Sequence, residues 1–199
     1  MPQPKPQKES AGSPDDLQTP ARALWPLLPL IKPGSVIWEC ACGTGNLVRE
    51  LEARGFAVMA TDIKMPSVPA ELPQYNFLTY TPDRHYDMII TNPPYSLKDE
   101  FIARCYALGK PWALLLPITS FEGKVRQALF KKHGVQVILF DKRIAFEVPD
   151  AEPGKKSAAW FATAWFTWGL NLPHDLMFVD FDPPKPKPKS LDSFAEGPL

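Results

Sequence analysis

Short apolar runs that alternate with amphipathic helical patterns most limit how this chain can fold. The run "YDMIIT" (86–91) is almost continuously hydrophobic, as expected of a strand whose two faces are both covered. Strands that alternate with helices form mostly parallel sheets with helices packed on them. We therefore expect an α/β domain.

The expected elements follow from this alternation. Strand-like segments occupy 35–41, 57–62, 75–78, 86–91, 111–117, 135–140 and 159–168. Helical spacing of apolar residues predicts helices over about 45–54, 98–108 and 120–132, with Gly55 ending the first. The segment 75–78 ("YNFL") is short and resembles an edge strand.

Proline content indicates where the domain begins and ends. The chain has 199 residues, enough for one domain, and its 24 prolines are unevenly placed. Residues 1–16 and 183–199 are rich in Pro, Lys and Ser, which predicts disordered tails on either side of a domain over 17–182. The Lys-Pro repeat at 185–189 can be a weak nucleic-acid contact or simply a solvated tail.

Charge and cysteine content narrow the function classes. The formal net charge is zero, so global charge gives no argument for a nucleic-acid partner. Three cysteines, with no secretory leader and no apolar run that could span a bilayer, predict a cytoplasmic protein without a membrane partner. Cys40 and Cys42 lack the further ligands of a zinc site, so we expect buried thiols and no metal.

In such sheets ligands bind beyond the carboxyl ends of the strands. The first strand runs into "ECACGTG" (39–45), whose glycines let the backbone approach a ligand closely. Val48 occupies the place of the third glycine in the dinucleotide fingerprint. Asp62 ends the next strand, at the right distance to bind ribose hydroxyls. This pattern favours a nucleoside ligand, with S-adenosylmethionine the obvious candidate.

Each of these residues also has a simpler interpretation. Asp62 can be a helix cap or a turn former. Gly43 and Gly45 can make a tight strand-to-helix turn without binding anything. Glu39 can be a solvated charge, or it can accept a hydrogen bond from the amino group of a bound methionine moiety.

The buried strand 86–91 ends in Asn92, Pro93, Pro94 and Tyr95. A nucleobase amino group is a poor nucleophile until both its N–H groups donate hydrogen bonds. The Asn92 side-chain carbonyl and the Pro93 main-chain carbonyl can accept them, and Tyr95 can stack on the ring. The prolines fix the turn, which holds the acceptors where charge develops. The alternative is a proline turn capped by Asn92, with Tyr95 in the core.

These motifs together resemble the S-adenosylmethionine-dependent amino-methyltransferases, in particular small phage-type DNA adenine methyltransferases. The resemblance covers about 18–168. It implies a Rossmann-like class I methyltransferase fold: a mostly parallel seven-stranded sheet with an antiparallel terminal strand and helices on both faces. It also implies methyl transfer to adenine in DNA by base flipping, with S-adenosylhomocysteine as product. A phage or prophage would use this reaction in a bacterial cytoplasm to mask DNA from restriction.

The resemblance also assigns residues. Asn92 to Tyr95 would bind the target amine, with Asn92 also at the cofactor. The other expected cofactor-binding residues are Thr19, Pro20, Glu39, Ala41, Cys42, Gly43, Gly45, Asp62, Ile63, Asn76 and Phe77. The expected substrate-binding residues are Tyr95, Ser96, Lys155, Lys156, Trp160 and Phe161. Thr19 and Pro20 can equally be a helix N-cap followed by an N1 proline, and Trp160 can be a structural strand residue.

Two departures from the family qualify these expectations. Asn76 stands where the family has an acidic residue, and no segment is long enough for a separate target-recognition domain. We therefore expect a short or relaxed recognition sequence with phosphate contacts dominating affinity, and a monomer or weak homodimer. One alternative is methylation of an RNA base or of a protein glutamine. Another is a non-catalytic nucleotide-binding or DNA-binding module. Methylation of the cytosine amino group is less favoured, because serine commonly replaces Asn92 in cytosine-specific relatives.

Overall fold

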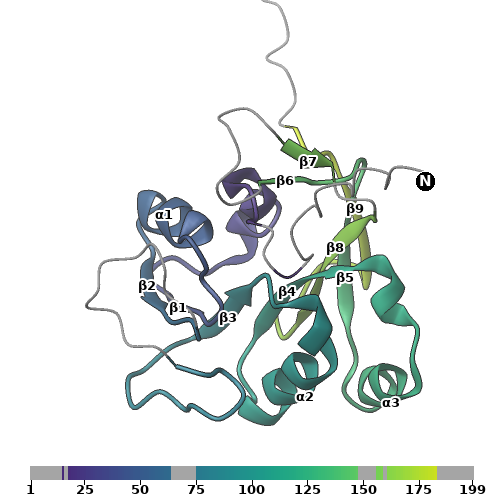
Figure 1. Cartoon of the computed structure of the whole chain (residues 1–199), viewed down its shortest axis with the longest axis horizontal. Helices are drawn as coiled ribbons and strands as arrows, with labels where there is room; N and C mark the ends of the chain where they lie inside the picture. The colour runs from purple at the N-terminus through teal and green to yellow at the C-terminus, as the bar shows by residue number, and fades with distance from the viewer. Residues whose placement is uncertain (1–14, 16–17, 64–74, 148–155, 159–160, 183–199) are drawn as a thin grey trace, which may run out of the picture.

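A seven-stranded sheet forms the centre of the molecule (Figure 1). The computed structural model describes residues 15, 18–63, 75–147, 156–158 and 161–182. The strands are β1 Val36–Glu39, β2 Ala57–Ala60, β3 Met88–Thr91, β4 Trp112–Pro117, β5 Gln136–Phe140, β8 Thr163–Trp168 and β9 Leu176–Val179; β6 Ala145–Glu147 and β7 Lys156–Ala158 form a separate hairpin. The helices are α1 Asn46–Ala53, α2 Lys98–Leu108 and α3 Lys124–His133, with 3₁₀ turns η2 Ala21–Leu24, η3 Leu28–Leu30, η4 Tyr95–Leu97 and η5 Ile118–Phe121.

The sheet order is β2-β1-β3-β4-β8-β5-β9, and one strand runs against the others. β1 pairs in parallel with β2 and β3, and β3 with β4. β8 is antiparallel to both β4 and β5, so the antiparallel strand lies inside the sheet. The expected mostly parallel seven-stranded sheet is confirmed.

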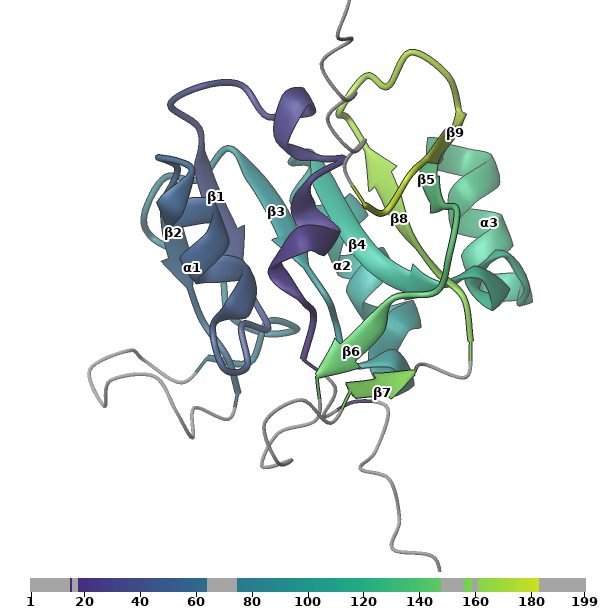
Figure 2. The same cartoon turned by 90° about the horizontal axis from the view of Figure 1, so that it is seen from above.

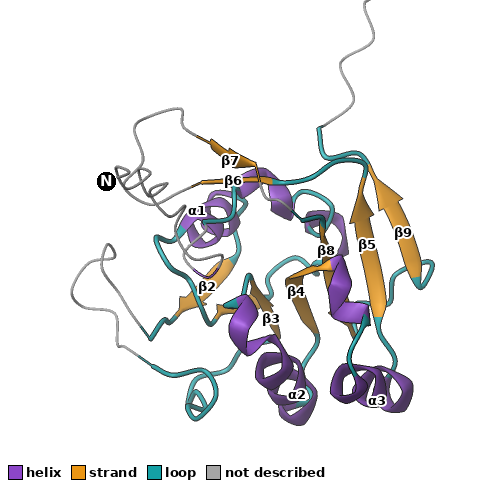
Figure 3. Ribbon diagram, turned by 45° about the vertical axis from the view of Figure 1, so that its right-hand side comes forward, coloured by secondary structure: helices purple, strands orange, loops and turns teal. Residues whose placement is uncertain are grey.

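Each face of the sheet has its own apolar core. The 3₁₀ turns η2 and η3 and helix α1 cover one face (Figure 2), where Leu24, Leu51 and Trp165 are fully buried. Helices α2 and α3 cover the other face (Figure 3), against Trp38 and Phe166. None of the helices that the structure describes has the length and apolar character needed to span a bilayer.

The main sheet has seven strands, as expected, but one of them differs from the expected set, and the hairpin of β6 and β7 was not predicted. Residues 75–78 form a turn in which Tyr80 N–H donates to the Asn76 carbonyl at 2.8 Å, so this segment is not the edge strand we expected. The edge strand is β9, which pairs in parallel with β5. The apolar run of β9 is only four residues long, and it follows the segment "NLPHD" (171–175), which resembles a loop. This strand was therefore not predicted. Apart from Asp15, the expected tails lie outside the described residues.

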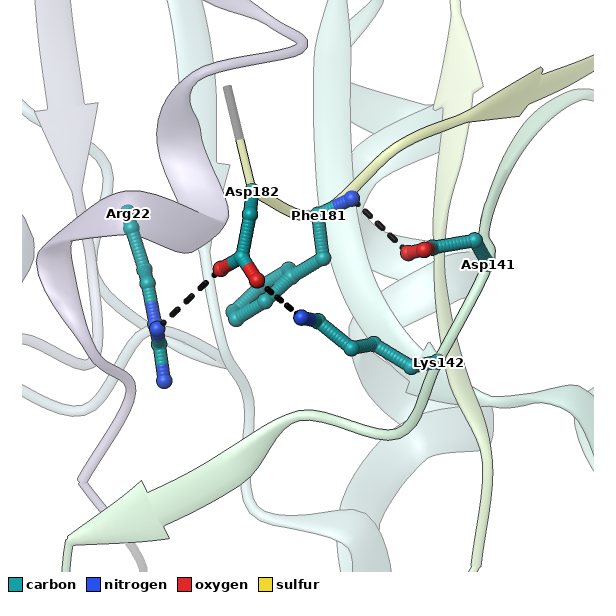
Figure 4. Close-up of polar contacts among 5 residues, drawn as sticks. All are labelled: Arg22, Asp141, Lys142, Phe181 and Asp182. Carbon is teal, nitrogen blue, oxygen red and sulfur yellow. Dashed lines mark hydrogen bonds and ion pairs between the residues drawn. The ribbon is translucent and has the colours of Figure 1, made fainter. Parts of the chain in front are cut away.

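The C-terminal segment after β9 closes on the start of the domain (Figure 4). The Arg22 guanidinium lies 4.6 Å from the centre of the Phe181 ring. Asp182 pairs with Arg22 at 3.4 Å and also with Lys142. Phe181 N–H donates to Asp141 Oδ1 at 2.8 Å. These contacts connect η2 to the segment after β9 and to the residues that follow β5.

A buried hydrogen bond fastens η2 to the sheet: Trp165 Nε1 donates to the Ala23 carbonyl at 2.7 Å. We predict that Trp165→Phe lowers the free energy of unfolding by about 3 kcal/mol, because it removes packing volume and leaves a buried carbonyl without a donor. Urea unfolding followed by circular dichroism measures the change.

The matched control is Trp112→Phe. Trp112 is also fully buried, but its Nε1 has no hydrogen-bond partner within the described residues. Its replacement loses packing and no hydrogen bond, so we expect a loss smaller by about 1 to 2 kcal/mol. Equal losses in the two variants would show that the bond to Ala23 contributes nothing.

Candidate active site at the carboxyl ends of the strands

The loop between β1 and α1 is tied to the end of the neighbouring strand. Gly43 N–H donates to Asp62 Oδ2 at 2.8 Å, and Cys42 N–H donates to the Thr61 carbonyl at 3.1 Å. Gly43 and Gly45 have φ angles of +51° and +80°, which favour glycine. The structure therefore brings together the glycine loop and Asp62, as the sequence predicted, and Asp62 orders the loop directly.

Gln18 clamps the same loop from the opposite side. Its side-chain Oε1 accepts hydrogen bonds from the Thr44 N–H at 3.0 Å and the Thr44 hydroxyl at 2.8 Å. A Cβ atom on Gly43 would lie 2.7 Å from this oxygen, so a larger residue there would displace the Gln18 side chain in addition to straining the backbone. Gln18 also exchanges two backbone hydrogen bonds with Glu147, which joins the loop to β6.

Thr19 and Pro20 continue from this clamp. The Thr19 carbonyl accepts a hydrogen bond from Asn46 Nδ2 at 3.3 Å, beside the start of α1. Pro20 is the residue before η2 and no side chain caps that turn. The Thr19 hydroxyl is buried with no hydrogen-bond partner in the described part of the chain. The N-cap alternative therefore does not account for this hydroxyl.

Glu39, the last residue of β1, is 1% exposed. Its Oε1 accepts the Ala41 N–H at 3.1 Å, while Oε2 is buried with no partner among the described residues. Burial raises the pKa of Glu39 to about 8, and Asp62 adds to the rise. The Ala41 amide and the nearby Thr91 hydroxyl act in the other direction and lower the pKa of Glu39. The Thr91 hydroxyl itself makes no hydrogen bond within the described residues. The Glu39 carboxyl is thus largely protonated at neutral pH. A cation bound nearby would lower its pKa and favour the carboxylate.

The motif Asn92 to Tyr95 follows β3 and ends in the 3₁₀ turn η4. Asn92 Oδ1 is buried and accepts no hydrogen bond in the described structure. Tyr95 is buried with its ring edge-on to Phe161 at 5.5 Å, and this burial raises the pKa of its hydroxyl. Lys98 Nζ donates to the Tyr95 carbonyl at 3.0 Å. Packing and hydrogen bonding thus fix the turn while one strong acceptor is left unsatisfied.

Ser96 has a partner from the N-terminal segment. Its N–H and hydroxyl donate to the two carboxylate oxygens of Asp15, at 3.1 and 2.5 Å. Asp15 also contributes to the raised pKa of Tyr95. This contact places a negative charge beside the predicted substrate side of the site, which the sequence did not indicate.

Buried polar atoms without partners gather along this edge of the sheet. Such atoms are uncommon in proteins, because each is destabilising unless something satisfies it. Those that lie at or just beyond the strand ends here belong to Thr19, Glu39, Thr91, Asn92, Tyr95, Ser120 and Thr163. Ser120 and Thr163 were not predicted, since a single hydroxyl in "ITSF" or "FATA" carries no sequence signal.

The other residues that were predicted to bind cofactor or substrate do not form one cluster. Ile63, next to Asp62, is 59% exposed. Asn76 is exposed and its Oδ1 accepts the Leu78 N–H at 2.9 Å. Phe77 lies in the core, stacked on Phe101 at 4.6 Å, so its cofactor contact stays a prediction from resemblance. Lys155 and Trp160 lie outside the described residues, and only the backbone of Lys156 is described, in β7.

The three cysteines are all buried. Cys40, Cys42 and Cys105 are buried free thiols, and burial raises the pKa of Cys42 to about 12. Thiols of this kind stay protonated and unreactive. No group of three or more His, Cys, Asp or Glu side chains that could hold a metal occurs in the described residues.

Comparison with known proteins identifies the fold. No family model matches the chain, and no curated protein matches it. Solved structures do match. A protein described as a class I S-adenosylmethionine-dependent methyltransferase from Listeria monocytogenes is 16% identical, with a TM-score of 0.54, over 85% of this chain and 67% of that one. The chain has the class I methyltransferase fold.

A second structure supports this assignment of the fold. An S-adenosylmethionine-dependent methyltransferase from Archaeoglobus fulgidus is 11% identical, with a TM-score of 0.50, over 74% of this chain and 92% of that one. At such low identity the likeness establishes the architecture alone. The residues that bear on function are those at the strand ends.

The buried carboxyl of Glu39 makes the stability of the protein depend on pH. The folded-state pKa of about 8 lies above the ordinary value of 4.5, so the folded protein holds this proton more tightly than the unfolded chain. Its contribution to stability therefore falls as pH rises from about 4.5 to about 8. We predict that Glu39→Gln removes this fall and raises the free energy of unfolding at pH 8 by roughly 4 kcal/mol.

Urea unfolding at pH 5 and pH 8 measures this effect, with Glu52→Gln on the exposed side of α1 as the control. The gain should be small at pH 5 and large at pH 8 for Glu39→Gln, and absent at both for the control. A gain that does not change with pH would show that Glu39 is ionised in the folded protein.

Proposed function

We propose that this protein transfers a methyl group from S-adenosylmethionine to the exocyclic amino group of adenine in DNA. The observation that carries the proposal is Asn92 Oδ1, a buried acceptor without a partner in the described structure, held in an Asn-Pro-Pro-Tyr turn at the end of β3. A turn capped by Asn92 would use this oxygen internally. A site that receives an amino group would leave it available.

The other half of the site fits S-adenosylmethionine. Glu39 Oε2 is buried without a partner in the described residues, and would accept from the amino group of the methionine moiety. Asp62 would hold the ribose, and Gly43 allows close approach of the backbone. Ile63, exposed beside Asp62, offers an apolar surface to the adenine ring. When bound, the cofactor supplies a methyl group on a positively charged sulfur.

The chain's own residues prepare the acceptor amine. Asn92 Oδ1 and the Pro93 carbonyl accept its two N–H groups, which shifts electron density onto nitrogen and directs the lone pair at the methyl carbon. Pro93 and Pro94 fix the backbone, so the acceptors need no reorganisation during the reaction. Tyr95 stacks on the base. The proton leaves to water once nitrogen has become cationic, so no side chain with a special pKa is required.

Recognition of DNA follows from the same proposal. The amino group of a paired adenine lies within the duplex, so the base must be flipped out to reach the site. Lys155 and Lys156 would contact phosphates, with Trp160 or Phe161 near the flipped base. A compact domain offers few side chains to base edges, so we propose a short or relaxed target sequence. Protection of phage or prophage DNA from restriction, in a bacterial cytoplasm, is the role we propose.

The test separates this acceptor from the others. The full-length protein is incubated with radiolabelled S-adenosylmethionine and, separately, with adenine-containing duplex DNA, RNA, or a protein that presents a glutamine side chain. We expect label in DNA as N6-methyladenine. Label only in RNA or in protein would overturn the proposed acceptor, and tight nucleotide binding without transfer to any acceptor would indicate a binding module.

Two substitutions should separate the halves of the site. We expect Asn92→Ala to reduce transfer by about a hundredfold or more, because it removes a preorganised acceptor, while cofactor affinity stays within about twofold. We expect Asp62→Ala to weaken cofactor binding about ten- to a hundredfold, because hydrogen bonds to a carboxylate are lost. Isothermal titration calorimetry and single-turnover transfer measure the two effects. Equal loss of cofactor binding in both variants would contradict the assignment of the turn.

A further inference from the structure

Two of the buried hydroxyls at the site have no role in the proposed reaction. Ser120 is 0% exposed and Thr163 is 3% exposed, and neither hydroxyl has a hydrogen-bond partner in the described residues. Ser120 lies in η5, which follows the carboxyl end of β4. Thr163 is the first residue of β8, whose antiparallel direction places its start at the same edge.

The two hydroxyls lie on the acceptor side of the site. Thr163 pairs with Pro117, and Ile118 N–H donates to the Ala162 carbonyl at 2.9 Å, so η5 and the start of β8 are adjacent. Phe161, two residues before Thr163, packs against Tyr95. In the sheet order β1-β3-β4-β8, these groups flank the Asn-Pro-Pro-Tyr turn on the side away from the glycine loop.

Arg126 holds η5 in place relative to that turn. Its Nε donates to the Ser120 carbonyl at 2.9 Å, and its Nη1 pairs with Asp99 in the first turn of α2. A Cβ atom on Gly123 would lie 2.6 Å from the guanidinium, so glycine admits the arginine. The Ser120 backbone is therefore fixed by a partly buried cation, while the Ser120 hydroxyl has no hydrogen-bond partner among the described residues.

We propose that Ser120 and Thr163 are specificity residues that donate hydrogen bonds to ring nitrogens of the nucleobase whose amino group Asn92 receives. This inference rests on the proposed function and narrows its acceptor. A purine has ring nitrogens that accept hydrogen bonds beside its amino group, whereas a carboxamide side chain has a single carbonyl oxygen. Two hydroxyl donors on the β4 and β8 side of the Asn92 acceptor match the edge of a base.

The chemistry predicts opposite effects on stability and on recognition. A buried hydroxyl without a partner destabilises the free protein, so its removal should leave stability unchanged or higher. The same removal takes a hydrogen bond from the bound base. Residues that only support the fold would behave in the opposite way, with lower stability and unchanged recognition of the acceptor.

The experiment compares Ser120→Ala and Thr163→Val with Thr167→Val in the full-length protein. Thr167 lies on the same strand and is fully buried, but its hydroxyl donates to the Gln136 carbonyl at 3.1 Å. We expect the first two variants to keep or raise the melting temperature, keep cofactor affinity, and lose about tenfold in kcat/KM on adenine-containing duplex DNA. Thr167→Val should lower the melting temperature and keep kcat/KM.

Base analogues then identify the atoms. Duplexes that carry 1-deaza-, 3-deaza- or 7-deazaadenine each lack one ring nitrogen. The kcat/KM of the wild-type protein should fall about tenfold on at least one analogue relative to adenine. The variant that lacks the hydroxyl bonded to that nitrogen should have the same kcat/KM on this analogue as on adenine. The inference would be overturned by additive losses, by unchanged kcat/KM in both variants, or by melting temperatures that fall as in Thr167→Val. In each of these cases, transfer to adenine by the wild type would still support the proposed function. A wild type that methylates no nucleic acid overturns both.

Discussion

Coverage of the sheet on both faces is the constraint on which the rest of this structure depends. β3 and β4 are buried along their whole length, between α1 with η2 and η3 on one face and α2 with α3 on the other. The middle residues of both strands are apolar, because a buried polar side chain is destabilising unless it is hydrogen-bonded. Polar chemistry is therefore restricted to the places where strands end, and the parallel direction of β1, β3 and β4 brings those ends to one edge.

That edge holds groups whose properties are unfavourable in the free protein. Glu39 is buried with a raised pKa, and Asn92, Ser120 and Thr163 have buried polar atoms with no partner in the part of the chain that the structure describes. A fold that tolerates such groups needs firm support around them. Here the support comes from contacts behind the site, such as Arg126 between Ser120 and Asp99, and Trp165 against Ala23. Stability is concentrated in the two cores and is lowered at the edge where a ligand would bind.

The sequence predicted the parts of this arrangement that depend on local pattern. The α/β alternation, the glycine loop, Asp62 at the next strand end and the turn at Asn92 all lie within short segments whose residue types limit their conformation. It did not predict β9, because four apolar residues after a polar loop fit many structures, and it assigned a strand to 75–78, where Asn76 instead starts a turn. The clamp by Gln18 and the hydroxyls of Ser120 and Thr163 depend on contacts between distant parts of the chain, which no local pattern records.

The contacts of Gln18 connect the site to distant parts of the chain. One residue near the start of the domain bonds to Thr44 through its side chain and to Glu147 through its backbone. Arg22, four residues later, meets Asp182 beyond the last strand. The residue that bonds to the glycine loop is therefore itself held by a segment much later in the chain. Ligand binding at this edge would accordingly favour the completely folded domain over any partly folded form, so that occupancy of the site and completion of folding are thermodynamically linked.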